Sequence, residues 1–127
     1  MGNKTANQVL GKKGEQLAKK YLEQAGHNII AENYRSGRSE LDIISQKDST
    51  VVVSEVKSFY SKPLGAAEFR VNKRKQQQII KGVYGFLSEN PKYEGQDVRL
   101  DVIVVDFSSY PANITHHQSA FYDDGDY

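Results

Sequence analysis

The chain has 127 residues, of which 38% are hydrophobic and 26% charged, a size and composition typical of one globular domain. The absence of cysteine excludes disulfides and cysteine-based zinc sites and suits a cytoplasmic protein. The net charge is only +1, so bulk charge does not indicate a nucleic-acid partner, and no apolar run approaches the roughly 20 residues of a membrane helix.

Apolar residues recur at helical spacing over residues 7–25, which predicts a helix, and Gly26 is a suitable residue just past its end. Residues 28–34 are predicted to form a strand, and a turn follows at 35–38. Residues 40–46 and 50–57 are predicted to form two further strands, joined by a turn at residues 47–49.

The second half of the chain begins with a break at Pro63 to Gly65. A helix is predicted over about 67–89, and Asn90-Pro91 ends it. Residues 98–107 form a β-prone run in which 102–105 are expected to be buried on both faces. A short strand near 113–117 can follow.

The predicted order is αβββαβ and then a tail, which indicates an α/β domain with a mixed central sheet flanked by helices. We expect residues 1–127 to form a single domain without membrane contact. Its ends, about 1–6 and 122–127, are expected to be flexible.

Two carboxylates are predicted to oppose each other in the hairpin of residues 40–57. If its turn is centred on Asp48 and Ser49, Asp42 faces Glu55 across the two strands, with Cβ atoms about 5 Å apart. Lys57 shares the face of Glu55 and would lie opposite Glu40.

Opposed like charges destabilise a hairpin unless something compensates them. Lys57 compensates partly, and a divalent cation such as Mg²⁺, which prefers carboxylate oxygens, compensates more fully. The alternative is an exposed hairpin in which Glu40 and Lys57 form a surface ion pair of little energetic value. A shift of one residue in the register would move Asp42 to the other face.

Glu15 is a further candidate, because it lies at the edge of the apolar stripe of the first helix. It could lean toward the carboxylates or extend into water, and the helical pattern alone favours water.

These residues resemble a known arrangement. Asp42, a hairpin and then Glu55-Val56-Lys57 match the signature of the PD-(D/E)XK nuclease superfamily, whose core order is αβββαβ. The surrounding segments make the match more specific: Gly14-Glu15, Asn33-Tyr34-Arg35, Glu40 to Ile44, Lys75-Gln76, Arg99 to Val102 and Ala120-Phe121. Together they resemble the bacterial YraN family of proposed endonucleases, which is related to archaeal Holliday-junction resolvases and has a restriction-endonuclease-like fold.

The resemblance implies a role for each residue of this set. Asp42 and Glu55 would coordinate Mg²⁺, for which Mn²⁺ can substitute, and Lys57 would orient the attacking water and stabilise the transition state. Glu15 would complete the site and Lys75 would touch phosphate. The chain departs from the family pattern at Ser39, where glycine is usual, and at Phe59, where arginine is usual.

Basic residues are concentrated between Arg70 and Lys81, a stretch without acidic residues, so one face can be basic although the whole chain is nearly neutral. Arg70, Lys73, Arg74 and Lys75 are therefore the principal candidate DNA contacts. On a helix, Arg70, Lys73 and Arg74 would share one face and Lys75 would point about 100° away. Arg35 and Arg38 form a second cluster. The alternative is a solvated helix face.

Two other groups have a structural interpretation. Arg99 and Asp101, two residues apart on a strand, are predicted to form a structural ion pair or a support for the site. His27, His116 and His117 are interpreted as ordinary surface histidines, since adjacent residues on a strand point to opposite faces.

The predicted function is a Mg²⁺-dependent endonuclease that hydrolyses phosphodiester bonds in DNA, with branched or Holliday-junction DNA as one candidate substrate. The alternative is a non-catalytic DNA-binding or accessory protein that retains the nuclease fold. The resemblance to dimeric resolvases leaves a homodimer open, because two-fold symmetry suits a four-way junction.

Overall fold

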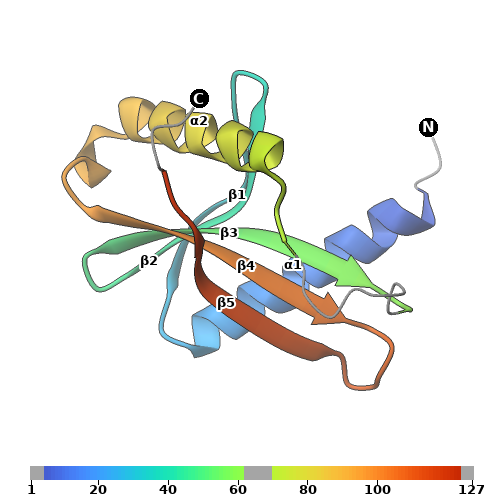
Figure 1. Ribbon diagram of the computed structural model, residues 1–127. Coiled ribbons are helices and arrows are strands. Elements are labelled where there is room, and N and C mark those ends of the chain that lie inside the picture. The colour runs from blue at the N-terminus through green and yellow to red at the C-terminus, as the bar shows by residue number, and fades with distance from the viewer. Residues whose placement is uncertain (1–4, 62–69, 124–127) are drawn as a thin grey trace.

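The computed structural model describes residues 5–61 and 70–123 (Figure 1). In this part of the chain the elements are, in order, α1 (Ala6–Gln24), β1 (Asn28–Ser36), β2 (Ser39–Lys47), β3 (Thr50–Phe59), α2 (Lys73–Glu89), a 3-10 turn (Pro91–Tyr93), β4 (Asp97–Asp106) and β5 (Asn113–Phe121). The predicted α/β architecture is confirmed, and the last strand is longer than residues 113–117.

The start of α1 is defined by local hydrogen bonds. The Thr5 side chain accepts from Gln8 N (3.1 Å) and the Gln8 side chain accepts from Thr5 N (2.9 Å), which is a capping box. Gly26 follows the helix with a φ of +94°, a conformation that glycine adopts without strain. The buried residues Leu10, Gly14, Ala18 and Leu22 recur every four positions, so α1 presents a single stripe to the sheet.

The start of α2 differs from the prediction. Asn72 is its cap, because the Asn72 side chain accepts a hydrogen bond from Lys75 N at 2.9 Å. The helix therefore begins at Lys73 and not near residue 67, and the expectation that Arg70 lies on it is wrong. Val71 is buried in the core instead. The predicted break at Pro63 to Gly65 lies outside the described residues.

The sheet has the strand order β1-β2-β3-β4-β5 in the described residues. Neighbouring strands are antiparallel except β3 and β4, which are parallel and joined through α2. Val51 to Val53 of β3 and Val102 to Val105 of β4 are buried, as central strands covered on both faces require. The burial predicted for residues 102–105 is confirmed.

Each helix covers its own face of this sheet (Figure 1). On one face α2 packs through Ile79, Ile80, Val83 and Phe86, and on the other α1 packs through Ala18 and Leu22. Two hydrophobic layers therefore enclose the sheet.

The predicted flexible ends fall mainly outside the described residues, which exclude 1–4 and 124–127. No helix within residues 5–61 and 70–123 has the length and apolar character that crossing a membrane would need.

Candidate active site

The β2–β3 hairpin has the predicted register. Its turn contains Asp48, with a φ of +55°, and the strands pair from Lys47 opposite Thr50 to Ile43 opposite Ser54. Asp42 and Glu55 are the next two positions, where the pairing stops. There the Asp42 Oδ2 accepts a hydrogen bond from Val56 N at 2.9 Å. The Asp42 side chain therefore bridges the two strands at the point where they separate.

Two lysines converge on Glu55. Val51 and Val53 of β3 belong to the layer under α2, so the alternate residues Glu55 and Lys57 face the same way. The Glu55 Oε1 lies 3.5 Å from Lys57 Nζ and 3.8 Å from Lys75 Nζ of α2. Lys75 of α2 therefore faces the carboxylate of Glu55.

The Asp42 carboxyl is electrostatically strained. Burial and then the negative charge of Glu55 raise the pKa of Asp42 to about 7, although the Val56 N–H and Lys75 act in the opposite direction. A hydrogen bond also joins the Asp42 and Glu55 side chains. Without a cation, this pair therefore retains a proton up to about neutral pH.

Glu15 joins the carboxylates from α1, because Gly14 lets that helix approach β3 closely. A Cβ atom at Gly14 would lie 1.7 Å from the Ser58 Oγ and 2.9 Å from the Ser58 Cβ, so any larger residue would force α1 or Ser58 to shift. Burial and then the charge of Asp42 raise the pKa of Glu15. Glu15 is partly buried beside Asp42, as the resemblance implied, and does not extend freely into water.

Asn33 is a site residue that the sequence analysis named only within a family-matching segment and gave no role. It has a φ of +50°, and with its amide nitrogen turned to the carboxylates it donates to Glu15 Oε1 at 3.0 Å and Glu40 Oε1 at 3.2 Å. The available signal was the residue type, since asparagine tolerates this left-handed conformation better than most residues.

The predicted pair of Glu40 with Lys57 is wrong. Glu40 Oε2 instead lies 3.2 Å from Arg35 Nη2, and Lys57 contacts Glu55. The physical reason is that β2 and β3 separate beyond Ile43 and Ser54, so the hairpin register does not extend to residues 40 and 57.

The donor set suits Mg²⁺ better than a transition metal. Within residues 5–61 and 70–123, no three or more Asp, Glu or His side chains are grouped to hold a metal ion. Asp42 and Glu55 form a two-carboxylate site, and Mg²⁺ is commonly bound by one or two carboxylates together with waters and substrate phosphate. A cation bound between Asp42 and Glu55 would neutralise the negative charge that the retained proton otherwise neutralises.

Arg99 and Asp101 form the predicted structural ion pair. Arg99 donates to the fully buried Asp101 through Nε and Nη2, both at 2.9 Å. Asp101 Oδ2 also lies 2.6 Å from His116 Nε2, and Ser119 N donates to Oδ1 at 3.0 Å. Tyr21 OH of α1 contacts His116 Nδ1 at 3.0 Å. The network thus ties β4 and β5 to α1.

The interpretation of all three histidines as surface residues is wrong for two of them. The His116 side chain is buried in this network, and His27 is buried with its Nδ1 at 2.9 Å from Ser45 Oγ. His117, the neighbour of His116, is exposed.

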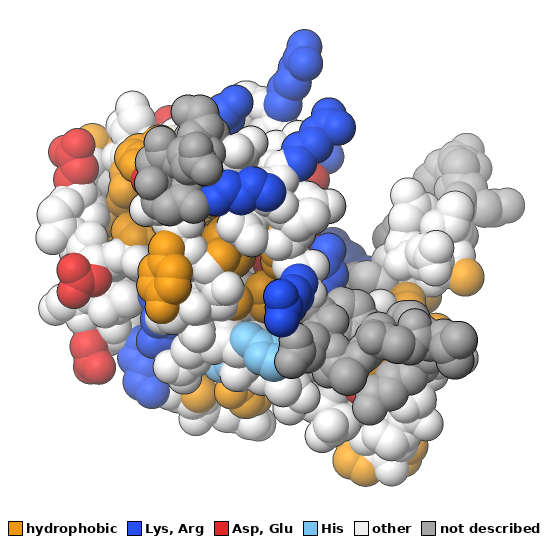
Figure 2. All heavy atoms as spheres, viewed as in Figure 1, with side chains coloured by type: hydrophobic (Ala, Val, Ile, Leu, Met, Phe, Trp, Pro, Cys, Tyr) orange, Lys and Arg blue, Asp and Glu red, His pale blue; other side chains and the backbone are white. Residues whose placement is uncertain are grey.

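The predicted DNA-contacting residues do not all line one hollow. Arg38 and Arg74 line one groove between the β1–β2 turn and α2, whereas Arg70 lines a separate hollow with Val71 and Phe121. Arg35 is highly exposed and pairs with Glu40, and Lys73 is exposed at the start of α2. In Figure 2, Lys and Arg side chains gather around the N-terminal half of α2 and the adjoining hairpin, and the acidic side chains lie mainly at the other side of this view.

The two departures from the family pattern are structural. Ser39 is buried and its Oγ donates to the Gln78 carbonyl of α2 at 2.7 Å. Phe59 is buried in the layer under α2. An uncharged side chain therefore packs where the family pattern has an arginine.

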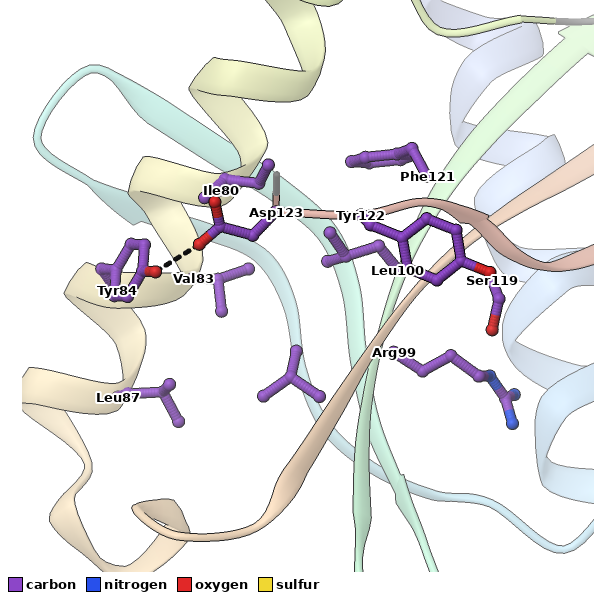
Figure 3. Close-up of a pocket in the computed structure, with 11 residues that line it drawn as sticks. Ile80, Val83, Tyr84, Leu87, Arg99, Leu100, Ser119, Phe121, Tyr122 and Asp123 are labelled. Atoms are coloured by element: carbon purple, nitrogen blue, oxygen red, sulfur yellow. Dashed lines mark hydrogen bonds between the residues drawn. The ribbon is translucent and has the colours of Figure 1, made fainter. Parts of the chain in front are cut away.

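A pocket of about 200 Å³ lies between α2 and the strands β4 and β5 (Figure 3). Its walls include Val83, Leu100 and Phe121, and the Tyr84 hydroxyl donates to Asp123 at its rim. None of the residues around Asp42 and Glu55 lines it, so it is separate from the carboxylate site.

Comparison with known proteins finds a matching family model and similar relatives. The model of the uncharacterised protein family UPF0102 matches residues 14–105, a span that contains all the carboxylates and both lysines of the site. Similar relatives are UPF0102 proteins of Chloroherpeton thalassium (38% identical over 78% of this chain and 76% of the relative), Sulfurihydrogenibium sp. (35%, over 87% and 92%) and Syntrophus aciditrophicus (36%, over 92% and 91%).

Proposed function

This chain belongs to the uncharacterised protein family UPF0102, and we propose that it is a Mg²⁺-dependent endonuclease that hydrolyses phosphodiester bonds in DNA. The observation that carries the proposal is the pair of Asp42 and Glu55, which share a hydrogen bond and lie beside two lysines. An Asp, a hairpin and Glu-x-Lys, on an αβββαβ core, also support a place in the PD-(D/E)XK nuclease superfamily.

Asp42 and Glu55 are the residues that would hold the metal. Mg²⁺ bound there would polarise the scissile phosphate and lower the pKa of an attacking water. The protein keeps the two carboxylates together before any cation arrives, because the Val56 N–H holds Asp42 and two ammonium groups hold Glu55. The site is thus preorganised.

The lysines and Glu15 supply the remaining functions. Lys57, on the same strand face as Glu55, would orient the attacking water and stabilise negative charge that develops on the phosphate. Lys75 would contact phosphate from α2. Glu15, whose pKa is raised, would complete the site as a third carboxylate, contributed by α1.

The second candidate is a DNA-binding or accessory protein that retains the fold without turnover. Two observations favour it: Phe59 packs into the core at the position of the usual arginine, and within residues 5–61 and 70–123 no three potential ligands are grouped for metal binding. We prefer the hydrolase, because a protein without catalysis has no need to bring Asp42 and Glu55 together at a cost in stability.

The test is cleavage of labelled linear, flapped and four-way DNA by the full chain with Mg²⁺, with Mn²⁺ or with chelator. We expect metal-dependent cleavage, with branched DNA as the preferred substrate and a two-fold symmetric dimer acting on the four-way junction. Asp42→Asn and Glu55→Gln should each reduce the rate by roughly 100-fold or more.

Asp48→Asn is the matched control, because Asp48 lies at the other end of the same hairpin and asparagine tolerates its positive φ. It should cleave as the wild type does. Cleavage by Asp42→Asn at the wild-type rate would show that the site is wrongly assigned. If the wild type binds DNA and cleaves none of the substrates with either metal, the accessory role is correct.

A further inference from the structure

A basic groove of about 560 Å³ lies between the β1–β2 turn and α2. Arg38 of the turn and Arg74 and Lys81 of α2 contribute its charge, and Gln77 and Gln78 line it between them. No acidic residue lines it in the part of the chain that the structure describes. The groove is therefore a concave surface of one sign of charge.

Close packing of the helix on the turn shapes this groove. A Cβ atom at Gly82 would lie 2.9 Å from the Ser39 Cβ, and one at Gly85 would lie 1.9 Å from the Ser36 Oγ. The hydrogen bond from Ser39 Oγ to the Gln78 carbonyl also joins the turn to α2. The backbone segments that carry the cations of the turn and of the helix are therefore held at a defined separation.

The three cations have no counter-charge in the part of the chain that the structure describes. Arg38, Arg74 and Lys81 are exposed, and none has an ion-pair partner among residues 5–61 and 70–123. Only solvent or a bound anion can therefore screen the repulsion between these three positive charges.

The first turn of α2, which shares Arg74 with the groove, adds a further indication of an anion. It contains Lys73, Arg74 and Lys75 and no acidic residue. The N-terminus of a helix carries a partial positive charge, so cations there are disfavoured and anions are favoured. A bound phosphate group would relieve this arrangement, because it pairs with the side chains and suits the helix dipole.

We propose that this groove binds the phosphodiester backbone of DNA at a position flanking the hydrolysed bond. The inference rests on the proposed function. Lys75 contacts Glu55, and Arg74 is the preceding residue, about 100° around the helix. A strand that lies in the groove therefore passes over the start of α2 toward Asp42 and Glu55, and Lys81, absent from the sequence-based set, is one of its contacts.

The test is binding of a labelled DNA duplex by the full chain in chelator, where no metal-dependent cleavage occurs, over a series of salt concentrations. Arg74→Glu with Lys81→Glu should weaken binding at least tenfold and reduce the slope of log affinity against log salt by about two, since each phosphate contact contributes about 0.9. Arg38→Gln alone should reduce the slope by about one.

The matched control is Lys13→Glu with Lys20→Glu on α1, which has the same seven-residue spacing, the same charge change and exposed positions. It should change affinity less than twofold at high salt and leave the slope unaltered. Equal effects of the two double variants would overturn the proposed role of the groove and show that DNA affinity responds only to the net charge of the protein. The groove proposal would also be overturned if the groove variants lost binding to poly-glutamate or duplex RNA but kept their binding to DNA.

The experiments distinguish a failure of the groove proposal from a failure of the proposed hydrolysis. If the groove variants bind DNA normally while Asp42→Asn abolishes cleavage, the groove is wrong and the hydrolase stands. If the groove variants lose DNA binding and the wild type does not cleave DNA, the groove proposal is supported and the proposed hydrolase function is wrong. Circular dichroism of each variant verifies that it is folded.

Discussion

The Val56 N–H donates a 2.9 Å hydrogen bond to Asp42 Oδ2 at the position where β2 and β3 stop pairing. The carboxylate thus takes the place of a backbone acceptor and is held beside Glu55. This arrangement satisfies one partly buried N–H and confines two negative charges to one place. Stability and the proposed function are therefore opposed at Asp42, and the cost in stability can be measured as a function of pH.

Asp42→Asn should stabilise the metal-free protein at pH 8 and have little effect at pH 4. The folded protein binds a proton at Asp42 up to about pH 7, whereas the ordinary value is 3.8, so folding is penalised progressively as pH rises between these values. The gain should reach a few kcal/mol, at most about 4. Urea denaturation from pH 4 to pH 8 measures it, and a gain that is independent of pH would contradict the pKa assignment.

The hairpin could be predicted because its determinants are local. Asp48 and Ser49 define the turn, and the register of β2 and β3 follows from it. The separation of the strands at Asp42 could not be predicted from a hairpin rule, because it coincides with the left-handed Asn33 on the adjacent strand and with the approach of α1 at Gly14. These are contacts between segments distant in sequence.

The errors in the sequence analysis have two causes, one local and one tertiary. The sequence contains no clear break between Arg70 and Lys73, and the side-chain cap of Asn72 marks the start of α2 in the structure. His116 lies on an edge strand, where exposure is the usual expectation, and it is buried because Tyr21 of α1 covers it. A cap and a tertiary contact both override a local pattern.

Asp101→Asn should destabilise the protein strongly at neutral pH. Burial acts to raise the pKa of Asp101, but hydrogen bonds from His116, Arg99 and Ser119 hold it below its ordinary value. The stabilisation is therefore fully present above the unfolded pKa near 3.8 and is lost as pH falls through the lower folded pKa. Breaking a buried pair costs about 3–5 kcal/mol.

Chemical denaturation at pH 7, pH 5 and pH 3 tests this prediction, and the difference between variant and wild type should be equal at the first two values and smaller at the third. Tyr21→Phe is the graded control, since it removes only the hydroxyl at the far end of the network and should cost about 1 kcal/mol. A neutral Asp101→Asn variant would mean that the network contributes nothing to stability.

Gly14→Ala and Gly11→Ala should have opposite effects, although they lie three residues apart on α1. A Cβ at Gly11 meets nothing within 4 Å, whereas one at Gly14 would lie 1.7 Å from Ser58 Oγ. Gly11→Ala should stabilise by up to about 1 kcal/mol through helix propensity, and Gly14→Ala should destabilise by about 1–3 kcal/mol through overpacking.

Combining Gly14→Ala with Ser58→Gly should recover part of the loss, because it removes both Ser58 side-chain atoms that the new Cβ would meet. Displacement of α1 also moves Glu15, so Gly14→Ala should reduce cleavage more than Gly11→Ala does. Thermal unfolding and cleavage rates of the four proteins provide the measurement, and equal stabilities of the two alanine variants would exclude close packing of α1 on β3.

Lys75→Ala and Arg74→Ala should separate catalysis from binding, because these adjacent residues face different parts of the molecule. Lys75 Nζ lies 3.8 Å from Glu55 Oε1, whereas Arg74 lines the groove beside the β1–β2 turn. Lys75 also lowers the pKa of Asp42, so its removal should raise that pKa further. The acid limb of the cleavage profile then moves to higher pH, and the maximal rate falls by roughly 100-fold through loss of charge stabilisation.

Arg74→Ala should leave the position of the acid limb unchanged, weaken DNA binding in chelator and reduce its salt slope by about one. Lys75→Ala should change that slope less. The measurements are single-turnover cleavage from pH 5.5 to pH 9 and anisotropy titrations in chelator for both variants and the wild type. If Lys75→Ala leaves the acid limb in place while reducing the rate, Lys75 acts on substrate alone and the ionisation of Asp42 does not limit cleavage. If both variants lose binding and rate in equal proportion, the two residues contact the same phosphates, and the division between carboxylate site and groove is incorrect.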